Sequence, residues 1–199
     1  MEPADVDVRP AHAVPWEDVR TVLDSRADGR RCSCQRWKMQ PGESWASVGA
    51  EALAARLREQ VGCDDPDATT TAGLVAYLDG EPVGWCAVEP RSVYGRLLRN
   101  ARVPWDGRDE DRSDAGVWAV TCVLTRARYG GRGIATALAA AAVEHARRSG
   151  ARAVEAYPMT TTAALPVEMH PGTVAMFAAA GLRPVVPPTA RRVVMRLEL

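Results

Sequence analysis

Three glycines within one short segment could hold a phosphate group. Residues 129–136 read Tyr-Gly-Gly-Arg-Gly-Ile-Ala-Thr and join an apolar, strand-like stretch (residues 117–125) to an alanine-rich, helix-like stretch (residues 134–148). Glycine lets the backbone approach a ligand closely and adopt positive φ. The first turn of the helix adds unpaired N–H groups at the positive end of its dipole. We therefore expect several N–H donors to converge on one anion, although a tight strand-to-helix connection would also explain the glycines.

Two familiar phosphate-binding loops do not fit this turn. No Lys-Ser or Lys-Thr pair follows the last glycine, as a P-loop requires, and no acidic residue about 20 positions further on completes a dinucleotide-binding unit. Glu155 is the nearest acidic candidate, but it lies in a predicted strand where another role is open to it. The remaining interpretation is a pyrophosphate loop for a ligand whose reactive group lies elsewhere.

The turn resembles the acetyl-CoA pyrophosphate loop of the GNAT superfamily of N-acetyltransferases. That loop commonly reads Gln/Arg-Gly-x-Gly-x-Gly/Ala at the same kind of junction, and residues 130–135 read Gly-Gly-Arg-Gly-Ile-Ala. Gly130 replaces the usual Gln or Arg, while Arg128 and Arg132 flank the loop and could supply positive charge. The resemblance covers roughly residues 70–199. It implies that these residues bind the cofactor: Gly131, Arg132, Gly133, Ile134, Ala135 and Thr136.

A second segment, residues 173–182, resembles the GNAT sequence Ala-x-x-Leu-Tyr-x-x-x-Gly-Phe, in which a helix ends at a glycine. Aligned on Gly181, Phe177 stands where the family usually has Tyr, and His170 where it usually has Asn. Together with the Cys-x-Cys sequence at residues 32–34, the chain resembles a bacterial branch of the superfamily. Both substitutions bear on the mechanism.

The resemblance also implies a site for the pantetheine arm of acetyl-CoA. In GNAT enzymes two adjacent parallel strands diverge, and the arm pairs with the first of them as a further strand would. The equivalent edge here comprises Val123, Leu124 and Thr125, whose backbone groups are expected to bind the cofactor while their side chains lie in the core. Peptide N–H groups aimed at the thioester carbonyl would stabilise the oxyanion that forms during acyl transfer.

The expected reaction is direct attack of a free amine on the thioester, which requires removal of a proton. This need is large for a lysine-like amine with a pKa of about 10.4 and small for an α-amine with a pKa near 7.7. Glu155 and Tyr157 lie two residues apart in a predicted strand and therefore on one face. Some relatives carry a catalytic Glu on this strand, so Glu155 is the first candidate base, assisted by Tyr157 or His170. An ion pair of Glu155 with a surface arginine such as Arg152 remains an equal alternative, and His170 could be a loop residue without a catalytic role.

The predicted elements support the resemblance. A helix that joins two strands makes them parallel, whereas Asp79-Gly80 signals an antiparallel hairpin. The resemblance implies an α/β fold with a mixed, mostly antiparallel, twisted sheet of about seven strands, a central parallel splayed pair and about four flanking helices. Without the resemblance, the order of the elements predicts only a mixed α/β sheet. Periodicity predicts strands over residues 5–9, 73–78, 82–89, 117–125, 153–157, 183–186 and 191–199, and helices over residues 15–23, 47–60, 134–148 and 172–180.

Length and composition indicate one globular domain spanning residues 1–199. The chain is 47% hydrophobic, and its 25 basic residues equal its 25 acidic ones, so we expect neither a nucleic-acid nor a membrane partner. The polar residues 1–10 lack the apolar stretch of a signal peptide, which favours a cytoplasmic protein. The five cysteines are then expected to be reduced, and their spacing with the three histidines predicts no metal site.

Three functions remain open at this stage. The first is an acetyltransferase that moves an acetyl group from acetyl-CoA, its co-substrate, to a primary amine of a small molecule; a homodimer is compatible with it. The second modifies an N-terminal or lysine amine of a protein. The third is an acyl-CoA-binding sensor without turnover, suggested by Phe177 and by Ala119, where some relatives have a catalytic Glu.

We expect the acceptor pocket to be walled by the loop after the first helix, residues 90–115 and the segment before the last helix. Four tryptophans are candidate linings: Trp37, Trp85, Trp105 and Trp118.

Overall fold

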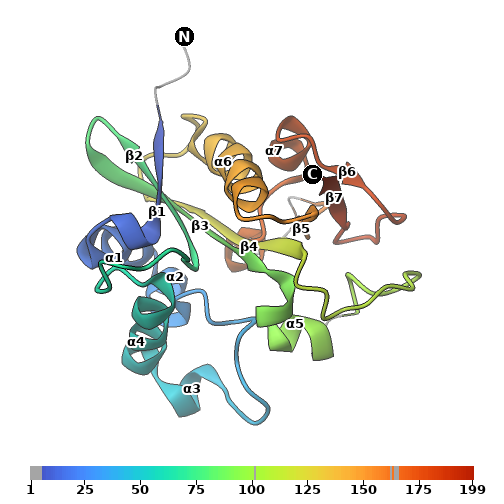
Figure 1. Cartoon of the computed structure of the whole chain (residues 1–199), viewed down its shortest axis with the longest axis horizontal. Helices are drawn as coiled ribbons and strands as arrows, with labels where there is room; N and C mark the ends of the chain where they lie inside the picture. The colour runs from blue at the N-terminus through green and yellow to red at the C-terminus, as the bar shows by residue number, and fades with distance from the viewer. Residues whose placement is uncertain (1–5, 101, 162, 164–165) are drawn as a thin grey trace.

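A seven-stranded sheet forms the centre of the structure (Figure 1). The structure is a computed structural model and describes residues 6–100, 102–161, 163 and 166–199. The strands are β1 (Asp7–Pro10), β2 (Gly73–Leu78), β3 (Glu81–Pro90), β4 (Val117–Thr125), β5 (Ala153–Ala156), β6 (Arg183–Pro184) and β7 (Met195–Glu198). They lie in the order β1-β2-β3-β4-β5-β7-β6, and only β4 and β5 pair in parallel. The mostly antiparallel sheet with a central parallel pair is therefore confirmed.

Helices cover both faces of this sheet. Helices α6 and α7 pack on one face, and α1, α2 and α4 lie on the other, where α5 also lies (Figure 1). The described residues form seven α-helices rather than the expected four, because three short ones occur in segments without a clear sequence period. Their bounds are α1 (Trp16–Asp24), α2 (Ala27–Cys32), α3 (Trp45–Val48), α4 (Ala50–Val61), α5 (Gly95–Asn100), α6 (Ile134–Arg148) and α7 (Val174–Ala179), and three 3-10 turns are η1 (Ala11–Ala13), η2 (Arg91–Val93) and η3 (Pro166–Met169).

The structure differs from the predicted helices in the region before β2. The helix predicted over residues 47–60 is divided at Gly49, whose φ of +85° ends α3 and precedes α4. Helix α2 was not predicted, because it contains Gly29 and little apolar sequence. A Cβ atom at Gly29 would lie 2.5 Å from the carbonyl oxygen of Leu23, so the close packing of α2 on the end of α1 requires glycine.

The outer strands are shorter than or shifted from their predicted ranges. Strand β1 begins at Asp7 rather than residue 5, which lies outside the described residues. Strand β6 occupies only the first two of residues 183–186, ahead of the prolines at 187 and 188, and β7 occupies only Met195–Glu198 of residues 191–199. Residues 162, 164 and 165 of the predicted variable segment also lie outside the description.

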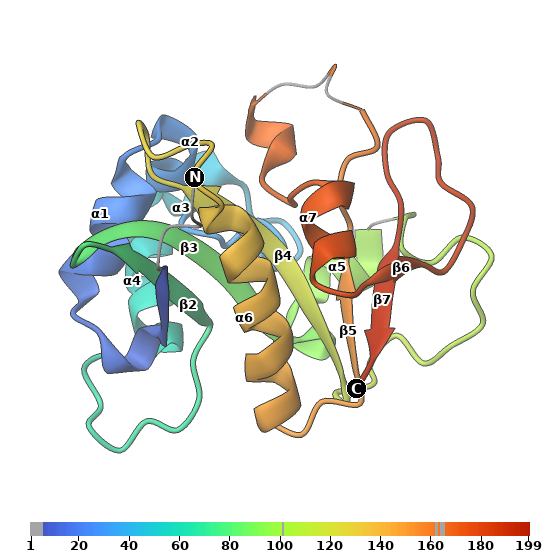
Figure 2. The ribbon, with the colours of Figure 1, turned by 90° about the horizontal axis from the view of Figure 1, so that it is seen from above.

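The two parallel strands diverge along their length, as predicted. Strand β4 pairs with β5 only between Val117 and Val120, opposite Ala153–Ala156, and the two separate beyond this point (Figure 2). Further along β4, the backbone N–H of Val123 donates instead to the carbonyl oxygen of His170, at 2.6 Å. The segment before α7 thus takes the place beside β4 that β5 has left.

Helix α6 lies very close to the sheet because small residues allow it. Its apolar face includes Ile134 and Leu138, and a Cβ atom at Gly84 would lie 2.7 Å from one and 2.8 Å from the other. This packing fixes the start of α6, and with it the glycine turn, against β3 and β4. In the part of the chain that the structure describes, no helix has both the length and the apolar composition to cross a membrane.

Candidate active site

The glycine turn before α6 presents free backbone donors. Gly131 and Gly133 have φ values of +78° and +79°, which favour glycine. Among the described residues, no backbone N–H from 130 to 136 donates a hydrogen bond to another protein atom. A Cβ atom at Gly130, Gly131 or Gly133 would meet nothing within 4 Å, so the space in front of the turn is open. The turn can therefore hold an anion, as its sequence predicts.

The charges around the turn also suit an anion. The turn opens the 15-residue helix α6, whose dipole places partial positive charge at this end. Arg128 and Arg132 are exposed beside it, and the Arg132 guanidinium lies 5.3 Å from the centre of the Tyr129 ring. Because the Ile134 side chain is buried in the core, only its backbone N–H faces the turn's ligand. A pyrophosphate fits this combination of donors and charges.

The three predicted pantetheine-binding residues differ in what their backbone groups now contact. Val123 directs its N–H away from β3, to the His170 carbonyl. Thr125 accepts a hydrogen bond on its carbonyl oxygen from Nε of Arg26, at 3.1 Å. Leu124 faces the opposite side of the sheet from Val123, and its buried side chain lines a pocket described below. Val123 thus offers a donor on the open side of β4.

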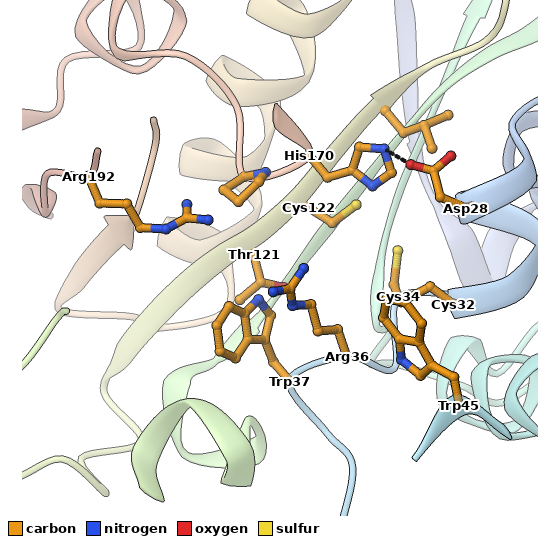
Figure 3. Close-up of a pocket in the computed structure, with 13 residues that line it drawn as sticks. Asp28, Cys32, Cys34, Arg36, Trp37, Trp45, Thr121, Cys122, His170 and Arg192 are labelled. Atoms are coloured by element: carbon orange, nitrogen blue, oxygen red, sulfur yellow. Dashed lines mark ion pairs between the residues drawn. The ribbon is translucent and has the colours of Figure 1, made fainter. Parts of the chain in front are cut away.

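A pocket lies on the same stretch of β4, against the side chains of Thr121, Cys122 and Leu124 (Figure 3). It encloses about 570 Å³, part of it open to solvent. Helix α2, the loop that follows it and the segment before α7 form the other walls, as expected, but the described residues among 90–115 contribute none of its lining. The lining residues beyond β4 are Asp28, Gly29, Cys32, Cys34, Arg36, Trp37, Trp45, His170, Pro171 and Arg192.

Of the four tryptophans expected around the acceptor, only Trp37 lines this pocket. Trp85 and Trp105 are buried, and Trp118 packs edge-on against His145. Trp45, which the sequence analysis did not select, supplies a second indole. The pocket therefore combines two aromatic rings with charged groups of both signs, a composition typical of small-molecule sites.

His170 and Asp28 form a hydrogen-bonded pair at the pocket wall. His170 Nε2 lies 2.8 Å from Asp28 Oδ2, and Figure 3 shows the ring turned so that its other nitrogen faces the pocket. Burial lowers the pKa of His170, partly opposed by the charge of Asp28. At neutral pH the ring is therefore uncharged. Because a carboxylate only accepts, the proton lies on Nε2 and the lone pair on Nδ1.

The backbone holds His170 in this position. Its carbonyl accepts from Val123 of β4, and Gly172 N–H donates to the Met169 carbonyl at 2.9 Å, which closes the turn before α7. Asp28 is held by α2, which Gly29 allows to pack closely on α1. The sequence indicated His170 as a catalytic candidate but gave no signal for Asp28, which follows an arginine and an alanine in a segment that reads as a turn.

Glu155 lies in a different environment from His170. Its side chain is fully buried and accepts hydrogen bonds from Arg108, from Arg196 at 2.7 Å and from Arg91 at 3.2 Å. The Tyr157 hydroxyl donates to the same carboxylate at 3.0 Å. Burial alone would raise the pKa of Glu155, but the arginines outweigh it and hold the pKa below its ordinary value. The ion-pair alternative describes this carboxylate well, with buried arginines in place of Arg152, which pairs with Asp114.

Neither Glu155 nor Tyr157 lines the pocket. Burial and the neighbouring Glu155 charge raise the pKa of the Tyr157 hydroxyl well above its ordinary value. Both side chains belong to a network that ties β5 to β7 and to residues 91–110, with Glu110 as its second carboxylate. The structure thus brings His170 together with the β4 edge, whereas Glu155 and Tyr157 lie in the charged network that joins β5 to β7.

We expect Glu155→Gln to lower the free energy of unfolding by roughly 3 to 5 kcal/mol, because it leaves three arginines without their shared buried anion. Urea denaturation measures this loss. The exposed Glu198, which pairs with Arg196, provides the control, and Glu198→Gln should cost less than about 1 kcal/mol. A Glu155→Gln protein of unchanged stability but without turnover would instead support Glu155 as the catalytic base.

Sequence comparison assigns the family of this fold. The family model described as the acetyltransferase (GNAT) family matches residues 35–166, about two thirds of the chain. The chain belongs to the GNAT acetyltransferase family. As a member, it is an acetyl-CoA-dependent N-acetyltransferase, and acetyl-CoA is its co-substrate. No curated protein matches the chain in sequence.

Solved structures share the GNAT fold with this chain at low sequence identity. An N-acetyltransferase from Staphylococcus aureus Mu50 is 12% identical, with a TM-score of 0.56 and coverage of 98% of this chain and 99% of that one. YncA, a putative acetyltransferase from Salmonella typhimurium with its cofactor acetyl-CoA, is 14% identical, with a TM-score of 0.54 and coverage of 98% and 94%. A ribosomal-protein-alanine N-acetyltransferase from Brucella melitensis is 17% identical, with a TM-score of 0.56 and coverage of 97% and 99%.

A group of cysteines distinguishes the pocket of this GNAT enzyme. Cys34 accepts a hydrogen bond on sulfur from the Trp85 indole at 3.0 Å and another from the Cys122 thiol. The Cys122 contact contributes most to lowering the pKa of Cys34, whereas burial raises the pKa of Cys32 to about 11. Ser33 and Cys34 both have positive φ, at +42° and +53°, a strained conformation for non-glycine residues. The loop therefore holds the Cys34 sulfur in one place.

Cys34 is expected to be alkylated by iodoacetamide roughly tenfold faster than Cys32 at neutral pH, because the gain in thiolate outweighs the lower nucleophilicity of a more acidic thiol. Peptide mass spectrometry at short reaction times measures both. Cys122→Ala should slow the modification of Cys34, whereas Cys122→Ser retains a donor and should slow it less. Faster labelling of Cys32 than of Cys34 would contradict the assignment of these pKa shifts.

Proposed function

We propose that the protein transfers the acetyl group of acetyl-CoA to a primary amine of a small molecule bound in the pocket of Figure 3, with His170 as general base. The observation that carries the proposal is the His170–Asp28 pair in the wall of a pocket that lies against β4. The lining of the pocket, two indole rings with a few charged groups, suits a small molecule.

The cofactor is proposed to extend from the glycine turn along β4. Its pyrophosphate binds the free N–H groups of Gly131 to Thr136, and its pantetheine arm runs beside Val123, Leu124 and Thr125. Val123 N–H can donate to the arm only in place of the His170 carbonyl that it contacts now. Cofactor binding therefore adjusts the segment that carries the proposed base.

The proposed role of His170 follows from its tautomer. Asp28 accepts a hydrogen bond from Nε2–H, which leaves the Nδ1 lone pair toward the pocket. The ring can then take a proton from the ammonium of the acceptor, the neutral amine attacks the thioester, and Asp28 stabilises the imidazolium that forms. An acceptor whose amine has a pKa near neutrality would need least help from this base, because more of it is already neutral.

The leaving thiolate receives no proton from the position of the usual family tyrosine. Phe177 stands there, fully buried in the core beside Gly172, and Tyr157 donates to Glu155 instead. A free thiol has a pKa of about 8.5, so a thiolate leaves readily near neutral pH without a strong acid. The absence of the tyrosine hydroxyl is therefore compatible with turnover.

Two alternatives compete with this proposal. Modification of an N-terminal or lysine amine of a protein is the activity class in the name of the Brucella relative, and it would need an acceptor site open to a peptide. An acyl-CoA sensor would need no base, so it leaves the His170–Asp28 pair without a purpose. The aromatic and charged lining of the pocket and the His170–Asp28 pair favour the small-molecule enzyme over both.

A thiol-release assay tests the proposal. Acetyl-CoA is supplied with a panel of small primary amines and, separately, with peptides that present N-terminal or lysine amines. Release of CoA with a small amine supports the proposal, and turnover with peptides alone overturns it in favour of the protein modifier. Calorimetric binding of acetyl-CoA without release for any acceptor would identify a sensor.

A further inference from the structure

Two arginines, Arg36 and Arg192, line the pocket. Arg36 follows α2, and Arg192 precedes β7, more than 150 positions later in the chain. Within the described ranges, no Asp or Glu oxygen lies within 4.0 Å of either guanidinium, whereas neighbouring Arg191 pairs with Glu168 at 2.8 Å. Arg36 instead lies 5.4 Å from the Trp37 ring centre, and Arg192 donates to the Tyr157 carbonyl at 3.1 Å.

The two guanidinium groups affect each other. Burial lowers the pKa of Arg192 and the positive charge of Arg36 lowers it further, whereas the negative charge of Glu168 partly opposes them. Arg36 is exposed and Arg192 is half-buried, so solvent screens part of the repulsion between these like charges, and an anion between them would remove more of it. Figure 3 shows both guanidinium groups near Thr121 and Trp37, on the side of the pocket away from Asp28.

The position of this pair relative to His170 is informative. The charge of Arg36 also lowers the pKa of His170, so the Arg36 charge acts on both the proposed base and Arg192. The Asp28 carboxylate already binds His170 and is not free to neutralise either arginine. A molecule whose amine lies at His170 would therefore place its other end against two guanidinium groups that have no carboxylate within 4.0 Å among the described residues.

We propose that Arg36 and Arg192 bind a carboxylate of the acceptor, so that the substrates of this enzyme are amino acids or other amines that carry a carboxylate. This inference rests on the proposed transfer to a small amine and specifies its substrate class. Arginine forks match a carboxylate in a bidentate geometry, and the Trp37 and Trp45 rings can cover the apolar part of the same molecule.

Matched acceptor pairs test the inference. ω-Amino acids of increasing chain length are compared with their carboxamides, which keep the size and the amine but lose the anion. The expected result is a kcat/KM for the best carboxylate roughly 10- to 100-fold above that of its carboxamide, the range of a charge-assisted hydrogen bond. An equal kcat/KM for both members, with CoA released, overturns the carboxylate site but leaves the proposed function intact.

Variants assign the preference to these residues. Arg36→Gln and Arg192→Gln should each lower the carboxylate-to-carboxamide ratio at least about tenfold, and both should leave the KM for acetyl-CoA unchanged. Arg191→Gln, next in the chain and paired with Glu168, is the matched control and should keep the ratio. If Arg192 had only a structural role, Arg192→Gln would reduce kcat/KM equally for the carboxylate and the carboxamide, and that outcome overturns the inference. A variant that raises only the KM for acetyl-CoA also overturns it.

A binding measurement covers the case in which no tested acceptor reacts. Calorimetry of the protein saturated with CoA compares 4-aminobutyrate, the probe, with 4-aminobutyramide and with a phosphate monoester of an amino alcohol. Tighter binding of 4-aminobutyrate than of its amide, lost in Arg192→Gln, supports the carboxylate site. Preference for the phosphate ester, or equal binding of all three, contradicts it. If acetyl-CoA reacts with no amine at all, that result contradicts the proposed function, and the binding comparison still tests the carboxylate site.

Discussion

Gly131→Asp is expected to raise the Kd of acetyl-CoA about 100-fold. The substitution places a carboxylate at the open face of the turn, where a pyrophosphate is proposed to bind the N–H groups of residues 131–136. Two unit charges about 4 Å apart near a protein surface repel by about 4 kcal/mol, and solvent and salt reduce this value. A loss of about 2.7 kcal/mol corresponds to the predicted factor of 100.

Gly131→Asn is the control for backbone strain. Gly131 has a φ of +78°, and asparagine and aspartate both tolerate this region better than other side chains do. Asparagine has the size of aspartate without its charge, so its effect on Kd should stay below about tenfold. Calorimetry at low and high salt measures both variants, and the difference should shrink as salt rises. Equal losses in the two variants would show that strain, rather than an anion site, explains the glycine.

The central part of the fold could be predicted from sequence because its signals are local. Strand β4 and helix α6 have the predicted bounds, 117–125 and 134–148. This junction has three strong local signals: a long apolar stretch, three glycines, and a helical period with basic residues near its end. Together they predict a strand, a turn and a helix with well-defined bounds. The same locality explains why the cofactor turn could be located before the acceptor pocket.

The acceptor pocket could not be predicted in the same way. Asp28, Arg36 and Arg192 come from short or irregular segments that meet only in the folded chain. The family alignment pointed to His170, but nothing in the sequence pairs it with Asp28, 142 positions earlier. Such contacts depend on tertiary packing, which periodicity does not encode.

Glu155 illustrates the opposite difficulty. Its place on β5 made it the first candidate base, because the strand pattern showed its face but not its partners. Two of the arginines that bind it, Arg91 and Arg108, come from residues 90–115, where no period allowed a prediction of position. A carboxylate with this many donors is stabilised as an anion and is a weak proton acceptor. The catalytic assignment of Glu155 remains a prediction, which the Glu155→Gln variant tests.

His170→Gln is expected to lower kcat/KM for the amine acceptor about 100- to 1,000-fold at pH 7, within the usual range for a general base. Glutamine can still donate a hydrogen bond to Asp28, but it cannot take a proton. The size of the loss should depend on the acceptor. An amine with a pKa of about 10 requires the base more than one with a pKa near 7.7, so the loss should be larger for the former. Steady-state kinetics with both kinds of amine measures this difference.

The pH dependence separates His170 from a structural histidine. Its pKa lies below the ordinary value of about 6.5, so the neutral base is present at pH 7 and is lost as the pH falls through that lower pKa. The acidic limb of the pH profile of kcat/KM should therefore have its midpoint below pH 6.5 and should disappear in His170→Gln. In Asp28→Asn the midpoint should move to a still lower pH, because this variant removes the charge that favours the imidazolium. His145 is the control, because burial also lowers its pKa but it packs against Trp118 outside the pocket. His145→Gln should keep the limb, and a limb that survives in His170→Gln would assign the base to another group.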